Sequence, residues 1–307
     1  MPGDRILIFS WNDLTFDIES ELIKRGHYVS SALRVPRKDI NSYDLILHWN
    51  ENPIADTRNF IKYIKSRGKK VVIYQHGRRA IPRTYEPYNE PLIADKVFVW
   101  GKSAKDKLIS GGTPEDKIVI TGSPVFKKLR PRKEHKGKNL LFIPIHWEKD
   151  NIENQIVVST LRKLKGVNIR TKILNTEHNP EDFDNPIISD RRLGGHWDLI
   201  AELLQDIDIV VSMNDSTLSM AAEYLDIPVV VPDIIIEGIH TADHMENQRV
   251  FSNACKVVKL DDLNETIYQQ LKNPQELSKE RQQSCIDDGG ADIKDPIKLF
   301  CDEIEKI

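Results

Sequence analysis

A polar loop in the second half of the chain has the residue types and spacing needed to bind a phosphate group. Residues 207–211 are apolar apart from Asp208, which predicts a buried parallel strand before the loop. Ser216 or Thr217 can cap a helix after the loop, and a second apolar strand begins at Pro228. Open α/β sheets bind ligands at the carboxyl ends of strands, and helix N-termini attract phosphate. We therefore expect a nucleotide or other phosphorylated ligand to contact the polar side chains of the loop: Ser212, Asn214, Ser216 and Thr217.

A carboxylate follows this loop about two turns into the predicted helix. Glu223 comes directly after Ala221 and Ala222, so we expect it to lie near packed structure rather than on a solvated helix face. A carboxylate in this position can accept hydrogen bonds from both hydroxyls of a ribose, as the acidic residue of a dinucleotide-binding fold does. The spacing therefore predicts ribose binding by Glu223.

A histidine stands at the end of an apolar run in the first half of the chain. His76 follows residues 71–75, and Gly77 after it permits a sharp turn or a close approach to a ligand. A histidine there can act as a general base on an acceptor hydroxyl, and a histidine merely hydrogen-bonded at the start of a loop remains an equal alternative. Arg78 and Arg79 come next; they are interpreted either as contacts to an acceptor or anion or as solvated surface residues.

Five other strand ends or loops carry polar residues. Asn12 and Asp13 follow the first strand; we expect Asn12 to contact an acceptor, and Asp13 is a second candidate for the base. Ser123, His146 and His178 each follow an apolar run and are expected to contact the donor, although turn chemistry or core packing explains such residues equally well. His240, Asp243, His244 and Glu246 form a polar loop without the spacing of a metal site, so no metal is expected.

The composition excludes several classes of protein. The chain has 307 residues, 30% of them charged, and its net charge of −3 argues against a general nucleic-acid binder. Its three cysteines lack metal or CxxC spacing, which indicates a reducing compartment. The N-terminus does not resemble a signal peptide, and no run approaches the ~20 apolar residues of a membrane span. These features predict a cytoplasmic protein without a transmembrane segment.

Short apolar runs alternate with helical patterns in both halves of the chain. In the first half, strands are expected at residues 5–10, 45–48, 71–75, 96–99 and 118–120, with helices at 15–26, 56–67 and 103–110. In the second, strands are expected at 139–144, 168–174, 207–212, 229–232 and 256–259, with helices at 152–164, 263–272 and 293–307. This alternation predicts an α/β protein with two Rossmann-like, doubly wound parallel-sheet domains facing a cleft.

A basic stretch separates the two series. Residues 127–138 contain seven Lys or Arg and no apolar periodicity, so they are interpreted as a linker. We expect an acceptor-side domain at 1–130 and a nucleotide-donor domain at 139–290. The last segment, 291–307, is expected to form a helix that returns to the first domain.

Several of these runs together resemble a known superfamily. Residues 75–77, 94–101 and 117–124 are similar to the first-domain signature of GT-B fold transferases, and most of all to that of CDP-glycerol glycerophosphotransferases and non-hydrolysing UDP-N-acetylglucosamine 2-epimerases. Residues 206–229 resemble the donor-nucleotide segment of the same superfamily, and residues 287–291 resemble its closing segment. The resemblance implies a GT-B-like fold.

The resemblance also implies roles for particular residues. His76 matches the cleft histidine, and His178 matches the histidine of the His-Pro element, although Asn179 here separates it from Pro180. Ser216 and Thr217 would hold donor phosphates, and Glu223 would hold the ribose. The interrupted His-Pro element and the sequence Met-Asn-Asp at 213–215 depart from the glycerophosphotransferases, which favours sugar transfer.

These observations predict a glycosyltransferase that moves a sugar from a nucleotide-diphosphate sugar, UDP- or CDP-linked, to an acceptor hydroxyl. The leaving diphosphate would be met by helix N-termini and side-chain donors rather than by a bound metal, with no other cofactor. The expected acceptors are a polysaccharide, a lipid-linked glycan or, through the basic linker, a modified base in DNA. The alternatives are a CDP-glycerol-type glycerophosphotransferase, an epimerase and a binding module without activity.

Overall fold

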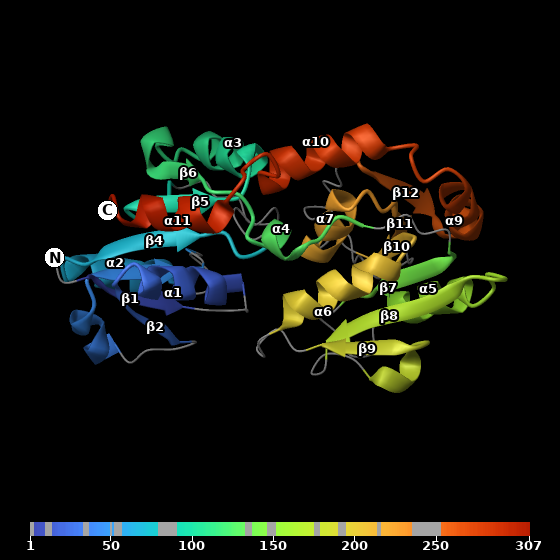
Figure 1. The fold of residues 1–307 in the computed structure, drawn as a ribbon, viewed down its shortest axis with the longest axis horizontal. Helices are drawn as coiled ribbons and strands as arrows, with labels where there is room; N and C mark the ends of the chain where they lie inside the picture. Colours follow the sequence, from blue (N-terminus) through green and yellow to red (C-terminus); the bar gives the residue numbers. More distant parts are fainter. Residues whose placement is uncertain are drawn as a thin grey trace. The chain divides into compact units, whose positions relative to one another are not determined.

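The computed structural model describes residues 3–9, 14–32, 37–49, 51, 57–78, 91–132, 137–145, 152–174, 179–189, 195–213, 216–234 and 253–307. The chain forms two compact units, each with its own six-stranded parallel sheet (Figure 1). The first contains the residues up to Lys127 and those from Ile286 onward, and the second contains most of the chain between Lys128 and Cys285. The predicted fold of two doubly wound parallel sheets is therefore confirmed.

The sheet of the first unit has the strand order β2-β1-β3-β4-β5-β6, with every neighbouring pair parallel. The order of the strands reverses between β1 and β3, and ligands of open α/β sheets bind at the carboxyl side of such a switch point. The strands are β1 (Arg5–Phe9), β2 (Tyr28–Ala32), β3 (Leu45–His48), β4 (Lys70–Tyr74), β5 (Lys96–Val99) and β6 (Ile118–Ile120).

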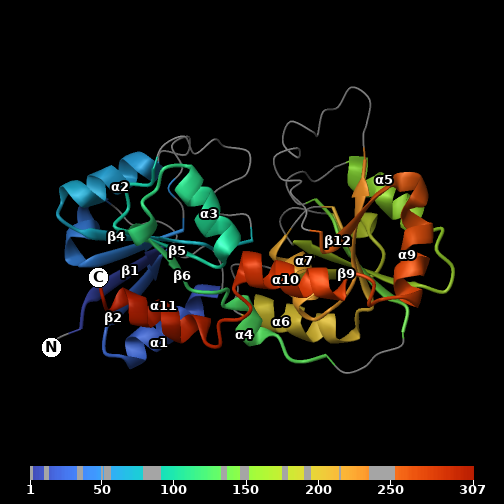
Figure 2. The ribbon, with the colours of Figure 1, turned by 90° about the horizontal axis from the view of Figure 1, so that it is seen from above.

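Helices cover both faces of this sheet (Figure 2). Because side chains alternate along a strand, Ile6 and Ile8 pack with α1 and α11, whereas Leu7 and Phe9 belong to the core beneath α2 and α3. The helices are α1 (Leu14–Lys24), α2 (Thr57–Ser66), α3 (Lys102–Ser110), α4 (Val125–Lys128) and α11 (Pro296–Ile304), with 3-10 turns η1 (Arg37–Ser42) and η2 (Glu115–Lys117).

The sheet of the second unit has the strand order β12-β11-β10-β7-β8-β9. Read from β9 and counted along the chain, this is the order 3-2-1-4-5-6 of dinucleotide-binding domains, with its switch point between β7 and β10. At that point Ser212 pairs with Ile143. The strands are β7 (Asn139–Ile143), β8 (Asn168–Leu174), β9 (Pro186–Ser189), β10 (Ile209–Ser212), β11 (Val229–Asp233) and β12 (Cys255–Lys259).

Two helix layers also enclose the second sheet. Val157 of α5 and Ile267 of α9 pack on the face that carries Phe142 and Val211, whereas α6 and α7 lie on the opposite face (Figure 2). The boundary between the units falls inside α10, between Cys285 and Ile286. The helices are α5 (Ile152–Leu161), α6 (His196–Leu203), α7 (Thr217–Tyr224), α9 (Leu263–Lys272) and α10 (Ser278–Gly289), with 3-10 turns η3 (Pro180–Asp182), η4 (Leu204–Asp206) and η5 (Leu260–Asp262).

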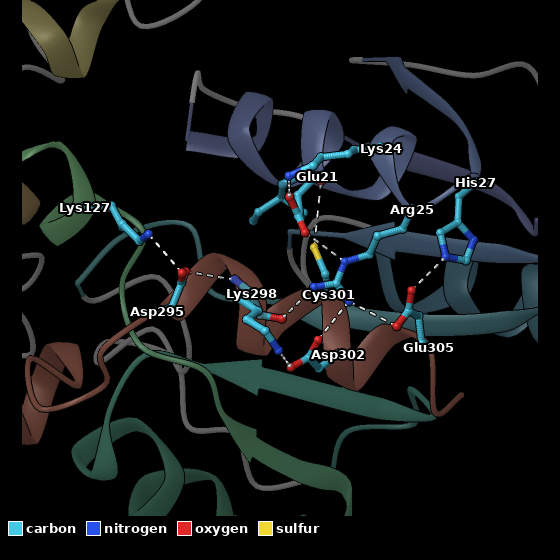
Figure 3. A network of polar contacts seen from close by, with 11 residues as sticks. Glu21, Lys24, Arg25, His27, Lys127, Asp295, Lys298, Cys301, Asp302 and Glu305 are labelled. Carbon is cyan, nitrogen blue, oxygen red and sulfur yellow. Dashed lines mark hydrogen bonds and ion pairs between the residues drawn. The ribbon is translucent and has the colours of Figure 1, made fainter.

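A network of charged residues holds α11 against the end of α1 (Figure 3). Arg25 Nη1 lies 2.8 Å from Asp302 Oδ1 and 3.0 Å from Glu305 Oε2, while Arg25 Nε donates to Glu21 Oε1 at 3.0 Å. Cys301 is buried beneath this network, and burial raises the pKa of its thiol to about 12. The last helix of the chain is thereby part of the first unit.

Acid is expected to weaken the attachment of α11. Hydrogen bonds from Lys298 Nζ and Arg25 hold the pKa of the Asp302 carboxyl below its ordinary value. A carboxylate with a depressed folded-state pKa stabilises the protein above its unfolded pKa of about 3.9, and this contribution is lost as the pH falls through the folded value. Urea unfolding measured between pH 6 and 2.5 should therefore give a shallower loss of stability for Asp302→Asn than for the wild type. Parallel curves for the two proteins would contradict this account.

No helix among the described residues is both long enough and apolar enough to cross a membrane.

Candidate functional site

The switch point of the second unit brings predicted donor-binding residues to one edge of its sheet. Ser212 is the last residue of β10 and is fully buried beside Ile143, the last residue of β7. The chain continues from these two strands toward Asn214 and His146, both of which lie outside the described residues, as does His178 after β8. The topology therefore places the ends of β7 and β10 side by side, and the contacts predicted for these three residues stay predictions.

The helix that follows β10 begins with a reciprocal cap. Ser216 Oγ accepts a hydrogen bond from Ser219 N at 3.1 Å, and Ser216 N donates to Ser219 Oγ at 2.9 Å. The predicted helix cap is thus confirmed at Ser216 rather than at Thr217, which is the first residue of α7. Because the cap is already made by side chains, the groups of this helix end best suited to an anion are first-turn backbone N–H groups and the Thr217 side chain.

Removing this cap should cost a modest amount of stability. Ser216→Ala deletes the acceptor of the Ser219 N–H, and loss of such a cap typically costs about 1 kcal/mol. Ser159→Ala is a matched control because its exposed hydroxyl bonds only to a carbonyl of its own helix. Urea unfolding should show a lower midpoint for Ser216→Ala and almost none of this shift for Ser159→Ala. Equal midpoints for the two variants would show that the cap contributes nothing.

Glu223 is buried near the end of α7, with 1% of its surface exposed. Its Oε2 accepts from Ser284 Oγ at 3.2 Å, and Cys255 Sγ lies 3.6 Å from Oε1. The alternative of a solvated helix face is therefore wrong for this residue. A carboxylate fixed in this way has a defined orientation, and its predicted contact with ribose hydroxyls stays a prediction.

In the first unit, the loop after β4 is held by the side chain of Gln75. Gln75 Oε1 accepts from Trp100 N at 2.7 Å, and Gln75 Nε2 donates to the carbonyl oxygens of Gly77 and Arg78 at 2.9 and 3.1 Å. One buried amide therefore fixes the loop to the end of β5 and closes the turn around His76. No role was predicted for Gln75 from the sequence, although its position at the end of a predicted strand is the signal that could have indicated one.

His76 is partly buried in this loop and contacts the end of β3. Its Nδ1 lies 3.1 Å from the carbonyl oxygen of Trp49, and the two rings pack edge to face with centroids 5.0 Å apart. A carbonyl oxygen only accepts hydrogen bonds, so this contact assigns the proton of the neutral ring to Nδ1 and the lone pair to Nε2. The loop therefore presents the tautomer that a general base requires at Nε2.

Arg78 is buried, which corrects the interpretation of this residue as a solvated surface cation. Its Nε and Nη2 lie 3.0 and 2.9 Å from Asp288 Oδ2, and its side chain has 0% exposure. A contact between Arg78 and an acceptor, as predicted, would require this pair to open. The other residues expected near an acceptor or base, Asn12, Asp13 and Arg79, lie outside the described residues.

Glu51 lies beyond β3 at the same edge and was not singled out in the sequence. Its Oε1 accepts from Ile93 N at 2.8 Å, its Oε2 accepts from Ala94 N at 3.1 Å, and Arg58 Nη1 is 3.4 Å away. Burial raises the pKa of the Glu51 carboxyl, although the two N–H groups and the Arg58 charge oppose that shift. These contacts tie β3 to the segment before β5, so we assign Glu51 a structural role.

A small pocket adjoins His76 within the first unit. Its lining includes Thr15, Gln75, His76, Trp100 and Gly122. Ser123 follows directly and is fully buried; its N–H donates to Gly289 O at 2.8 Å, and its Oγ has no hydrogen-bond partner among the residues that the structure describes. The structure thus places Ser123 in the same unit as His76, and the donor contact expected for it stays a prediction.

The basic segment between the units is partly neutralised by carboxylates. Lys127 pairs with Asp295, Lys128 with Asp198, and Arg132 with Asp208. These pairs favour the interpretation of the segment as a linker over that of a grip on nucleic acid. Within the described ranges, no group of three or more His, Cys, Asp or Glu is placed to hold a metal ion, and residues 240–246 lie outside those ranges.

No family model and no curated protein matches this chain in sequence. Solved structures do match it in fold. UDP-GlcNAc 2-epimerase from Neisseria meningitidis, bound to UDP-GlcNAc, aligns with a TM-score of 0.64 at 13% identity, over 99% of this chain and 100% of that one. The glycotransferase of kitacinnamycin aligns with a TM-score of 0.57 at 11% identity, over 100% and 99%. The wall teichoic acid polymerase TagF, soaked with CDPG, aligns with a TM-score of 0.58 at 11% identity, over 100% and 88%.

These similarities span nearly the whole length of both partners and establish the fold. The chain has the GT-B architecture of two Rossmann-like units, and its structural neighbours are the enzyme types that the sequence resembles. At 11–13% identity they do not carry an activity to this chain.

Proposed function

We propose that this protein is a glycosyltransferase that moves a sugar from a nucleotide-diphosphate sugar to an acceptor hydroxyl. The observation that carries the proposal is the start of α7 at the switch point of the second sheet, where β10 ends at the buried Ser212. A helix N-terminus beside a switch point attracts a diphosphate, and a carboxylate two turns on is suited to ribose hydroxyls.

The donor would bind to the second unit through its diphosphate and ribose. First-turn N–H groups of α7 and Thr217 would face the phosphates, where the helix dipole stabilises the negative charge that develops on the leaving group. Glu223 would accept the ribose hydroxyls. The remaining donor contacts that we propose are those of Ser123, His146, His178, Ser212 and Asn214.

The acceptor would be activated by the first unit. Nε2 of His76 would take the proton of the acceptor hydroxyl while the oxygen bonds to the anomeric carbon and the bond from that carbon to the diphosphate breaks. The hydrogen bond between Nδ1 and Trp49 O supports this role because it places the lone pair on Nε2. Asn12 and Arg79 are proposed acceptor contacts, and Asp13 is the alternative base.

Transfer of glycerophosphate from a CDP-linked donor is the second candidate. The structural similarity to TagF favours it, because the same histidine and helix N-terminus would serve attack at phosphorus as well as at an anomeric carbon. Epimerisation of a UDP-sugar is the third candidate reaction, supported by the fold similarity to UDP-GlcNAc 2-epimerase. Released products distinguish the three: a transferred sugar, CMP from a CDP-alcohol, or an epimerised UDP-sugar.

A thermal-shift panel of UDP, CDP, GDP, ADP and their sugars tests the donor site. A ligand that binds only the folded state at a hundredfold excess over its Kd stabilises the protein by about 2.7 kcal/mol, so a clear rise in Tm is expected for one nucleotide. The rise should be lost in Glu223→Gln and kept in Glu202→Gln, an exposed carboxylate on α6. Absence of any shift in the wild type would overturn the proposal.

A further inference from the structure

We propose that Asp288 is a positioning residue for His76, acting through Arg78 and the backbone of the loop between them. The proposal rests on the proposed role of His76 as the base, and it adds a residue that neither the sequence nor the fold similarity had connected to that histidine. Asp288 lies 210 positions from Arg78 in the chain, yet both belong to the first unit.

The loop that carries His76 is closed at both ends. At its start, Gln75 is fixed by Trp100 N; at its end, the Arg78 guanidinium is fixed by Asp288. The Gln75 amide also bonds to the carbonyl oxygens of Gly77 and Arg78, so a movement of Arg78 is transmitted to both ends of the turn. His76 stands between these anchors, and its ring is oriented by Trp49 O.

The segment that carries Asp288 is itself held against the ends of β5 and β6. Gly289 O accepts from Ser123 N at 2.8 Å. A Cβ added to Gly101 would lie 2.2 Å from Asp287 O, and one added to Gly290 would lie 2.4 Å from Trp100 O. Backbone therefore meets backbone on both sides of Asp288, so its carboxylate is a fixed anchor.

Breaking the pair would displace the histidine. Asp288 is only 9% exposed at its side chain and Arg78 is fully buried, so Asp288→Asn removes the negative charge that faces the buried guanidinium and favours its movement toward water. That movement would pull on the Arg78 carbonyl, open the turn closed by Gln75, and loosen the contact of His76 Nδ1 with Trp49 O. The neutral ring would then lose its preference for the tautomer with the lone pair on Nε2.

Nitrogen-15 NMR of histidine-labelled protein tests this positioning without any substrate. The His76 signals are assigned by their loss in His76→Gln. The wild type should show the Nδ1–H tautomer at neutral pH, and Asp288→Asn should show a mixture of the two tautomers. Asp302→Asn, which breaks another Arg–Asp pair of the first unit, is the matched control and should leave the His76 signals unchanged.

Kinetics with the donor found in the panel give the second readout. Asp288→Asn should lower kcat at least tenfold with the donor KM unchanged. Arg78→Lys, which keeps a cation opposite Asp288, should lower kcat by a smaller factor. If Asp288→Asn does not fold, Arg78→Met/Asp288→Leu replaces the buried pair by apolar side chains of similar size, which is often tolerated for stability. The double variant should fold, and because it lacks the hydrogen bond that fixes the end of the loop, it should still show the mixed tautomers.

The pair is purely structural if the variants lower only the Tm. An unchanged His76 tautomer in Asp288→Asn or in the double variant would overturn the proposal. The tautomer is measured on the protein alone, so failure of the donor panel would reject the proposed function without deciding this question. A mixed tautomer together with full turnover would overturn the positioning role as well.

Discussion

Replacing Gly290 by alanine is expected to lower the free energy of unfolding by about 3–5 kcal/mol, a large part of the stability of an ordinary domain. The added Cβ would lie 2.4 Å from Trp100 O and 2.9 Å from Gly122 Cα, both backbone atoms that no rotamer change can move. Gly290 also has φ +63°, a conformation that costs additional energy for a residue with a side chain. Urea or thermal unfolding of the purified variant measures the effect.

Gly68→Ala separates the two causes. Gly68 has a similar φ of +70°, but a Cβ there meets no atom of the described residues within 4 Å. This variant should therefore lose only the conformational part, about 1–2 kcal/mol. Gly101→Ala, which clashes with Asp287 O at ordinary φ, isolates the steric part. If Gly290→Ala were no less stable than Gly68→Ala, the close packing of residues 287–290 on the first unit would be wrong.

The strands of both sheets were predicted better than the side-chain contacts between them, because those contacts join residues far apart in the sequence. Strands β3, β5, β6 and β8 and helix α9 were predicted at the residues where they occur, because each combines an apolar run or stripe with clear ends. Strand β2 was missed because its sequence YVSSA lies at an edge and buries little. Strand β9 was missed because PIIS is short and begins with proline.

Helices without a strong apolar stripe were also missed. Helix α10 has the sequence SKERQQSCIDDG, which is mostly polar and typical of a segment exposed to solvent. Its buried side chains, among them Ser284 and Asp288, are held by Glu223 and Arg78 rather than by apolar packing. Such pairing depends on tertiary structure, so no local pattern in the sequence could have predicted it.

The candidate site was predictable in part for the same physical reason. The cap at Ser216 and the position of Glu223 on a helix were predicted because both depend on neighbours in sequence, and their donor contacts stay predictions. The burial of Arg78 was not predicted, because arginine is rarely buried without a partner and its partner lies 210 residues away. The contact of His76 with Trp49 O also joins the ends of two separate strands, β4 and β3. The sequence therefore predicted the histidine at the end of a strand but could not assign its tautomer.

Replacing His76 by glutamine is expected to lower kcat by about 10²–10⁴-fold, the range that a positioned general base contributes. The donor KM should stay within about threefold, because His76 belongs to the first unit and the proposed donor contacts of α7 belong to the second. Release of nucleoside diphosphate from the donor found in the panel, with and without acceptor, measures both constants. His27→Gln is the matched control, since His27 lies in the same unit but beside carboxylate oxygens of Asp4 and Glu305, at 3.7 and 3.6 Å.

The pH dependence of kcat/KM distinguishes a base from a group that only binds the acceptor. Protonation of Nε2 removes the lone pair that a base needs, so the wild-type kcat/KM should fall in acid and level off at higher pH. In His76→Gln this fall of kcat/KM in acid, the acid limb of the pH profile, should disappear. In His76→Ala, added imidazole should restore part of the rate by supplying the missing base. If His76→Gln kept the acid limb and lost less than threefold in kcat, another residue would be the base. Asp13 would then be the first residue to substitute. Loss of kcat with the limb intact would instead mean that His76 contacts the acceptor without accepting its proton, and Asp288 would then position a binding group rather than a base.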